Sequence, residues 1–440
     1  MIAKTPGPLS LFHKDTKANV AVIFAIAIIP ILGSIGCAVD YSMAVRLRSK
    51  LQSASDAASV GSVGKNSPAY LAAGTAPDGT ISVGGPDALT IFNANMAGES
   101  GYTLNSSTAT VVKAGSTVTS TVQFSATINT TFMKALGKNN MTLTGTSVSV
   151  SGIPVFIDFY LLLDNSPSMG VAATPADVAT MVNNTPDQCA FACHDLNDNN
   201  NYYKLAKNLG VTTRIDVVRT AAQSLMDTAA NTEVFNNQFR MAIYTFGASA
   251  STAALTTIAS LTSNLSTAKV QAGNIDLMTV NGQNQNNDQD TNFTTIFPQM
   301  NTAIPTPGPG TSASPQKFLF FVSDGVADEA NAACLKPTPN GVRCQSPLNP
   351  ALCTAIKARG VQIAVLYTTY LALPSNGWYN QWIAPFNPGP YGPSTNSEIA
   401  ANMKACSSPG YYFEVSPTDG ISQAMNALFQ KAVSNARISS

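Results

Sequence analysis

The sequence contains few charged residues and almost no histidine. Asp, Glu, Lys and Arg make up 11% of the 440 residues, and 24 basic side chains are balanced by 24 acidic ones. Without a basic excess the chain offers no electrostatic surface to a nucleic acid, so we expect no polynucleotide partner. The two histidines are His13 and His194, and the sequence has no Gly-x-Ser-x-Gly elbow, His-Glu-x-x-His helix or P-loop. We therefore do not expect an enzyme.

The apolar content, by contrast, is high. Hydrophobic residues account for 45% of the chain, which is enough for a substantial core. A length of 440 residues allows two or three domains. Ser, Thr, Asn and Gly supply most of the polarity, a balance that is typical of secreted and cell-surface proteins.

Residues 20–39 form an uncharged apolar stretch. About 20 apolar residues are needed to span a bilayer core, so we predict a single transmembrane helix here. Lys4, Lys14 and Lys17 precede it and Asp40 follows it, so the positive-inside rule places the amino terminus in the cytoplasm and the rest of the chain outside. The alternative is a cleaved signal peptide, which would release the protein.

The pattern of the chain changes three times after its amino terminus. Helical spacing of apolar residues continues beyond residue 39, Ser, Thr and Val then alternate in short runs, and strand-like and helix-like segments alternate from about residue 153. The predicted fold class is therefore α/β, with a doubly wound domain following a β-rich region. We predict four parts, namely a cytoplasmic tail (1–18), a transmembrane and stem helix (19–63), a β-rich linker region (64–152) and an α/β domain with insertions (153–440). The predicted insertions are residues 171–213, the Asn/Gln-rich stretch 282–290 and the Pro-rich stretches near 305–315 and 384–394.

Two apolar runs in the α/β domain end in oxygen-bearing side chains. Residues 155–163, broken only by Asp158, lead into Asp164-Asn165-Ser166-Pro167-Ser168, and residues 317–322 lead into Ser323-Asp324-Gly325. Such runs are typical of buried parallel strands, and ligands bind outside the carboxyl ends of those strands. Carboxylates and hydroxyls suit a hard cation such as Mg²⁺. We predict a metal site at this edge.

A third element supplies another hydroxyl. Thr291 stands two residues before the apolar Phe293 and a predicted helix, where its side chain is placed to join the same site. Thr294 takes this role if the helix begins later, and the sequence leaves both assignments open.

Together, Asp164, Ser166, Ser168, Thr291 and Asp324 resemble the metal-ion-dependent adhesion site of von Willebrand factor A domains. The resemblance implies direct metal contact by the two serines and the threonine, with the two aspartates bonding partly through coordinated water. It also implies an open coordination position for a partner carboxylate, and a divalent cation that is Mg²⁺, Mn²⁺ or Ca²⁺. Pro167 departs from the family pattern, in which glycine is commoner, and this affects the shape of the loop.

Six cysteines follow the apolar stretch, an even number that fits an oxidising compartment. Sequence alone leaves fifteen pairings open, and local spacing favours three of them. These are Cys189 with Cys193, Cys334 with Cys344, and Cys353 with Cys406.

The whole chain resembles TadG-like proteins of Flp/Tad (type IVc) pilus assembly. The resemblance is carried by residues 36–41 at the end of the apolar stretch, the Cys-Ala-Phe-Ala-Cys-His run at 189–194, and residues 314–328. It implies an inner-membrane protein with an extracytoplasmic von Willebrand factor A-like domain, which binds pilus or envelope components through a metal and takes part in assembly and surface adhesion. The alternatives are an adhesin that binds an external ligand directly and a metal-dependent hydrolase.

Overall fold

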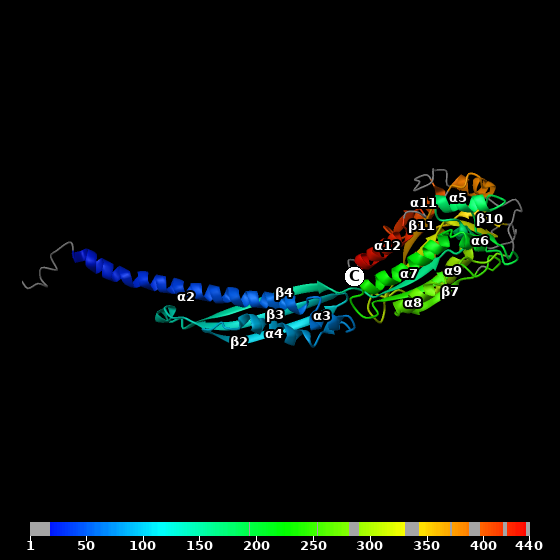
Figure 1. The fold of residues 1–440 in the computed structure, drawn as a ribbon. Helices are drawn as coiled ribbons and strands as arrows, with labels where there is room; N and C mark the ends of the chain where they lie inside the picture. The colour runs from blue at the N-terminus through cyan, green and yellow to red at the C-terminus, as the bar shows by residue number, and fades with distance from the viewer. Residues whose placement is uncertain are drawn as a thin grey trace, which may run out of the picture. The chain divides into compact units, whose positions relative to one another are not determined.

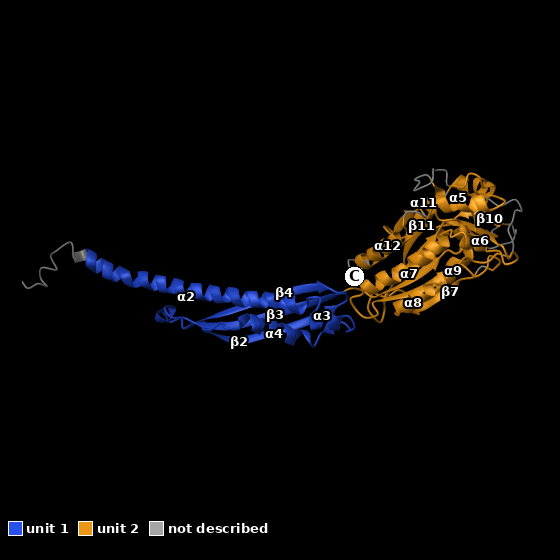
Figure 2. Ribbon diagram, viewed as in Figure 1, with its two compact units in different colours: residues 1–153 blue, residues 154–440 orange. Residues whose placement is uncertain are grey.

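The computed structural model describes residues 18–192, 194–252, 254–280, 290–330, 343–369, 372–386, 397–416 and 420–436. The chain divides into two compact units, residues 1–153 (unit 1) and residues 154–440 (unit 2), which Figure 2 shows in blue and orange. The predicted insertions at 282–290 and 384–394 lie mostly outside the described residues.

Unit 1 is built on one 45-residue helix, α2 (Ala18–Ser62). Its first part, residues 20–39, leaves nearly all of its apolar side chains exposed. Among the described residues, α2 is the helix that is long and apolar enough to cross a membrane. From Asp40 onward every third or fourth residue is buried, which is the stripe of a helix packed along one face. The buried apolar members of this stripe are Ala44, Leu47, Leu51, Ala54 and Ala58.

The stripe of α2 covers an antiparallel sheet. Its strand order is β1-β2-β3-β4, and the strands are β1 (Gly79–Thr80), β2 (Tyr102–Ala114), β3 (Thr117–Asn129) and β4 (Asn140–Gly152). Burial along β3 alternates residue by residue, so one face is apolar and needs a covering layer. Helix α2 and helix α4 (Gly84–Met96) supply that layer, and α3 (Pro68–Ala73) lies between them in the chain. The predicted stem helix and the β-rich region thus share one core. Figure 1 shows α2 lying along the sheet.

Unit 2 contains a six-stranded sheet of order β12-β11-β8-β5-β6-β7. The strands are β5 (Ile157–Leu163), β6 (Phe239–Thr245), β7 (Thr256–Thr262), β8 (Gln316–Ser323), β11 (Gln362–Thr368) and β12 (Tyr412–Val415). All neighbours pair in parallel except β7, which runs antiparallel at one edge. Every residue of β5 is buried, as the apolar run predicts for a strand covered on both faces.

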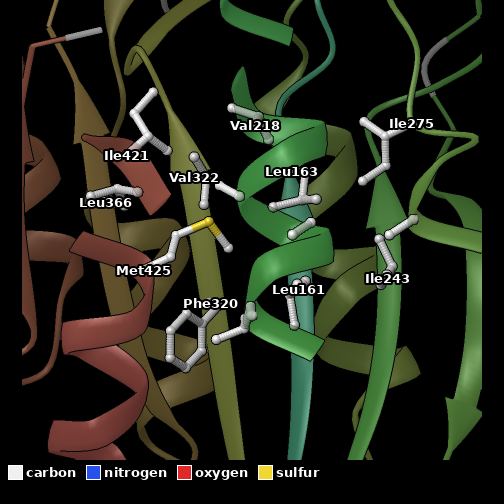
Figure 3. Packing of buried hydrophobic residues seen from close by; sticks show 14 of the residues in the cluster. Leu161, Leu163, Val218, Ile243, Ile275, Phe320, Val322, Leu366, Ile421 and Met425 are labelled. Carbon is white, nitrogen blue, oxygen red and sulfur yellow. The ribbon is translucent and has the colours of Figure 1, made fainter. Parts of the chain in front are cut away.

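Helices cover both faces of this sheet. One face carries α7 (Arg214–Thr232), α8 (Leu265–Ala272) and α12 (Ile421–Ala436), and the other carries α9 (Phe293–Ala303), α10 (Ala351–Lys357) and α11 (Glu398–Cys406). Figure 3 shows the first layer, in which Leu163 and Val322 of the strands pack with Val218 of α7 and Met425 of α12. The sheet is doubly wound, as predicted.

Short elements lie outside these layers. They are the 3₁₀ turn η2 (Pro167–Gly170), α5 (Pro175–Asn184), α6 (Tyr202–Asn208), the strand pair β9 (Val326–Ala330) and β10 (Arg343–Pro347), and the turns η3 (Tyr379–Ile383) and η4 (Ala384–Phe386). Helices α5 and α6 form part of the predicted insertion at 171–213.

The one charge in the β5 run, Asp158, is buried between two cations on the neighbouring strands. Arg240 of β6 donates to both carboxylate oxygens at 2.6 and 2.7 Å, and Lys317 of β8 donates to Oδ2 at 2.6 Å. All three residues share one register position across the sheet. The Lys317 side chain is 5% exposed and the Arg240 side chain 38%, so the lysine depends more on Asp158 for compensation.

We expect Asp158→Ala to lower the free energy of unfolding of unit 2 by about 3–5 kcal/mol, because it leaves a buried ammonium without its counter-ion. Denaturant titration followed by tryptophan fluorescence measures this, since both tryptophans, Trp378 and Trp382, belong to unit 2. Adding Lys317→Met should recover part of the loss; a double variant as unstable as the sum of the singles would contradict this account.

Candidate metal centre

The pairing of β5 with β8 places the two predicted aspartates at one edge of the sheet. Leu163 and Val322 are partners in the parallel register, and the Asp164 N–H donates to the Val322 carbonyl at 2.9 Å. The next residue of β8, Ser323, donates its hydroxyl to Asp164 Oδ2 at 2.5 Å. Asp164, Ser323 and Asp324 are each 0% exposed. The two carboxylates are therefore fixed beside each other in a buried site.

The two predicted serine ligands meet on the loop after β5. The Ser166 N–H donates to Asp164 Oδ1 at 2.9 Å, and the Ser166 and Ser168 hydroxyl oxygens lie 3.0 Å apart. Pro167 is the first residue of η2, where a proline loses no helical hydrogen bond. The proline is thus compatible with a loop on which both hydroxyls converge.

Asn165 fixes this loop to the rest of unit 2, a role that the motif did not reveal. Its side-chain amide donates to the Gly247 carbonyl at 2.8 Å and the Asp276 carbonyl at 3.1 Å, and its Oδ1 accepts from the Phe246 N–H at 3.0 Å. The backbone carbonyl of Asn165 also accepts from the Met278 N–H at 2.9 Å. The loop is therefore held before any ligand binds.

The two candidate threonines have different surroundings. The Thr294 hydroxyl donates to Glu329 Oε1 at 2.6 Å, and its N–H donates to Oε2 at 3.1 Å. Thr291 lies outside α9 and exchanges backbone hydrogen bonds of 3.0 Å with Asp328, a residue of the strand that follows Asp324. Glu329 thus engages the Thr294 hydroxyl, and the role of Thr291 as a metal ligand stays a prediction.

Arg343 holds the segment around Thr291 to β9. Its guanidinium forms ion pairs with Asp290 and with Asp328. Asp290 precedes Thr291 in the chain, and Asp328 is the residue of β9 that exchanges backbone hydrogen bonds with Thr291. Arg343 of β10 binds both aspartates, so the β9–β10 pair positions the threonine.

A buried arginine forms an ion pair with the second aspartate. Arg214 Nη1 lies 3.4 Å from Asp324 Oδ2, and both side chains are 0% exposed. Its Nη2 donates to the Thr369 carbonyl at 3.1 Å. No sequence motif pointed to a role for Arg214. A cation at a helix amino terminus opposes the helix dipole, and this conflict is the signal that could have singled it out.

Gly325 follows Asp324 at the carboxyl edge of the sheet, and its backbone is left-handed, with φ +78°. A Cβ added there would lie 2.7 Å from Met403 Cγ, so neither the conformation nor the space admits a side chain. Its N–H donates to Ser323 Oγ at 2.9 Å. The same hydroxyl donates to Asp164, so Gly325 orients the serine that orients the aspartate.

The electrostatics of the site favour a cation. Burial raises the pKa of the Asp164 carboxyl to about 7, and the negative charge of Asp324 adds to the increase, while hydrogen bonds from Ser166 and Ser323 oppose it. No cluster of three or more His, Cys, Asp or Glu occurs among the described residues, so a metal here would rely on hydroxyls. Buried carboxylates and hydroxyls at one point fit a hard divalent cation.

The cysteines can be placed only in part. Cys353 of α10 and Cys406 of α11 form a disulfide, the pairing that their spacing favoured. Cys344 is also disulfide-bonded. The predicted partners of Cys344 and Cys189, namely Cys334 and Cys193, lie outside the described residues.

The strand order, the antiparallel edge strand and the Asp-x-Ser-x-Ser loop define a von Willebrand factor A-type domain. The described part of the chain also holds one amino-terminal helix that is long and apolar enough to cross a membrane. Residues 18–63 match the family model described as "Putative Flp pilus-assembly TadE/G-like". The predicted resemblance of the amino-terminal segment to TadE/TadG-like proteins is thereby confirmed over these residues. No curated protein matches the sequence.

Solved structures with some likeness include two pilus proteins and one thread matrix protein. The von Willebrand factor domain of the type V pili tip protein Mfa5 from Porphyromonas gingivalis is 9% identical, with 65% of this chain and 97% of that chain covered and a TM-score of 0.38. The PilB minor pilin from Streptococcus sanguinis is 10% identical, covering 72% and 75%, with a TM-score of 0.33. Proximal thread matrix protein 1 from the mussel byssus, solved with a zinc-occupied MIDAS motif, is 12% identical, covering 64% and 46%, with a TM-score of 0.33. At these scores the fold assignment rests on the strand order.

We expect the free energy of unfolding of the protein, kept metal-free with a chelator, to fall as the pH rises from about 4 to about 7. The reason is that folded Asp164 keeps its proton to a higher pH than unfolded aspartate does. Above that range this contribution to the free energy of unfolding should be constant. Tryptophan fluorescence of unit 2 during denaturation measures the profile. Asp164→Asn keeps the shape without the charge and should flatten it; identical profiles for parent and variant would contradict the assignment.

We expect Thr291→Val to weaken Mg²⁺ binding by at least the roughly 10–100-fold that outer-shell changes produce, because it removes a ligand. Thr294→Val should leave the affinity nearly unchanged and lower the stability of unit 2, because the Glu329 carboxylate loses the hydrogen bond from the Thr294 hydroxyl. Calorimetric titration of Mg²⁺ into the detergent-solubilised full chain measures both. The assignment of Thr291 fails if the two variants change places.

Proposed function

We propose that the chain is a membrane-anchored component of Flp/Tad pilus assembly and surface adhesion, which binds a protein partner through a divalent cation. The metal ligands are Asp164, Ser166, Ser168, Thr291 and Asp324. The observation that carries the proposal is the pair of fully buried carboxylates, Asp164 and Asp324, at the carboxyl edge of the sheet. The hydroxyl oxygens of Ser166 and Ser168 lie 3.0 Å apart on the loop that follows Asp164.

The residues of the chain prepare the site for a cation. Ser323 and the Ser166 N–H hold both oxygens of Asp164, and Arg214 holds Asp324. Asn165 fixes the loop that carries both serines. This preorganisation lowers the cost of binding, because the ligands need not be ordered when the ion arrives. A bound divalent cation, most simply Mg²⁺, would offer an open coordination position to a carboxylate of the partner.

The pilus context is supported by the family match over residues 18–63, which covers the transmembrane part of α2. We propose that the helix anchors the protein in the bacterial inner membrane with its amino terminus in the cytoplasm, so that unit 2 meets pilus or envelope components outside. The disulfide between Cys353 and Cys406 fits an oxidising compartment.

Binding is favoured over hydrolysis by the position of His194. Its Nδ1 lies 3.3 Å from the Leu277 carbonyl oxygen, and its ring centroid lies 4.9 Å from that of Tyr203. These contacts belong to the packing of the insertion at 171–213, and they give the histidine a structural role.

We expect Asp164→Ala to abolish Mg²⁺ binding by the full chain and to reduce both pilus number and surface adhesion in cells that carry the variant in place of the parent. The physical reason is the loss of one of the two carboxylates that would hold the ion. Titration calorimetry measures the first effect, and electron microscopy with an attachment assay measures the second.

Asp227→Ala is the matched control, because it removes an exposed carboxylate of α7 that pairs with Lys269 at 2.7 Å. Immunoblots must show equal amounts of each variant in the membrane. Normal piliation and adhesion in cells with Asp164→Ala would contradict the proposed function, and lost metal binding with normal adhesion would separate the ion from that function.

A further inference from the structure

The turn between β3 and β4 exposes two large apolar side chains at its tip. Residues 130–139 form this turn and include the 3₁₀ element η1 (Met133–Leu136). Phe132 is 51% exposed and Leu136 is 74% exposed. Lys134 and Lys138 are exposed beside them. Apolar side chains interleaved with lysines are typical of segments that lie in a membrane interface.

The turn is fixed to α2 at one place. The Asp40 carboxylate accepts hydrogen bonds from the backbone N–H groups of Thr131, Phe132 and Met133, at 3.0, 2.8 and 2.7 Å. The Phe132 ring covers Gly36, where an added Cβ would lie 2.5 Å from Phe132 Cγ. Figure 1 shows the tip of the β3–β4 hairpin beside α2. The turn therefore has a defined height along the helix.

That height is the end of the apolar stretch of α2. Gly36 and Asp40 flank the last turn of residues 20–39, and a helix rises about 1.5 Å per residue, so the turn lies within about 6 Å of the point where the helix leaves the bilayer core. Three N–H groups solvate the Asp40 carboxylate, so the charge is compensated at this boundary.

Basic side chains continue beyond this boundary. Arg46, Arg48 and Lys50 are exposed on the next turns of α2, and Arg46 Nη2 lies 3.7 Å from the Glu99 carboxylate. A basic segment directly after a membrane span attracts anionic headgroups. Lys134 and Lys138 of the turn add to the same charge.

We propose that residues 130–139 form a second membrane contact of unit 1. Phe132 and Leu136 enter the interfacial layer of the bilayer that holds α2, and Lys134 and Lys138 meet lipid phosphates. Two contacts at one height restrict the rotation and tilt of unit 1 at the membrane surface, which a single helix leaves free. The inference rests on the anchoring of residues 20–39 and is independent of the metal site.

The test uses tryptophan as a probe of depth in the full chain, reconstituted in vesicles of phosphatidylcholine with and without phosphatidylglycerol. Leu136→Trp adds one fluorophore at the tip, and the emission of the parent, whose tryptophans lie in unit 2, is subtracted. We expect the added emission to shift to the blue and to be quenched by lipids brominated near the headgroup end of their chains. Phe132→Trp should behave in the same way.

Val150→Trp is the matched control. Val150 of β4 is 63% exposed, and it lies ten residues beyond Asn140, the first residue after the turn, or about 33 Å along the strand. Its emission should not be quenched. In vesicles with phosphatidylglycerol, Lys134→Glu with Lys138→Glu should reduce the quenching of a tryptophan at position 136. Quenching at position 136 no greater than at position 150 would overturn the proposal, whether both are quenched or neither is.

Discussion

The parallel pairing of β5 with β8 is the constraint on which the candidate metal site depends. It places Asp164 beside Ser323 and Asp324 because both strands end at the same level. Segments about 160 residues apart in sequence contribute to one point in this way. The apolar side chains of both strands pack into the two helical layers, so the core that stabilises the sheet also sets the spacing of the carboxylates.

The site also shows how charge is distributed where water is excluded. Two carboxylates cannot both be ionised in a buried position without compensation. Arg214 compensates Asp324, and hydroxyl and amide donors act on Asp164, whose pKa is nevertheless raised. The cluster of Asp158, Arg240 and Lys317 at the start of the same strands follows a different rule, because two cations there share one carboxylate. The charges of the Asp158 cluster are compensated within the chain, whereas the cluster of Asp164 and Asp324 is suited to an added cation.

The sequence predicted the fold of unit 2 and the placement of the site because both follow from local patterns. The apolar runs before Asp164 and Asp324 identified the strands, and the carboxyl-edge rule brought the two aspartates together. Arg214 and Asn165 were not predicted, because their partners, Asp324 and the backbone near Gly247, are neighbours only in the folded sheet. The packing of the stem against the β-rich region was missed for the same reason. The small residues of α2 are equally compatible with a helix that packs against no sheet.

The long contact between α2 and its sheet has a mechanical consequence. Hydrogen bonds join the helix to the strands along its packed length, from Gln52 to Ser147 at 2.8 Å, Ser59 to Ser149 at 2.8 Å and Ser62 to Ser120 at 2.8 Å. The first two pairs advance along β4, and the third joins the end of the helix to β3. A pull directed along the helix axis is therefore borne by all of them together, in shear, and the bonds cannot open one after another as in peeling. Unit 1 thus resists separation of α2 from its sheet under a pull in that direction.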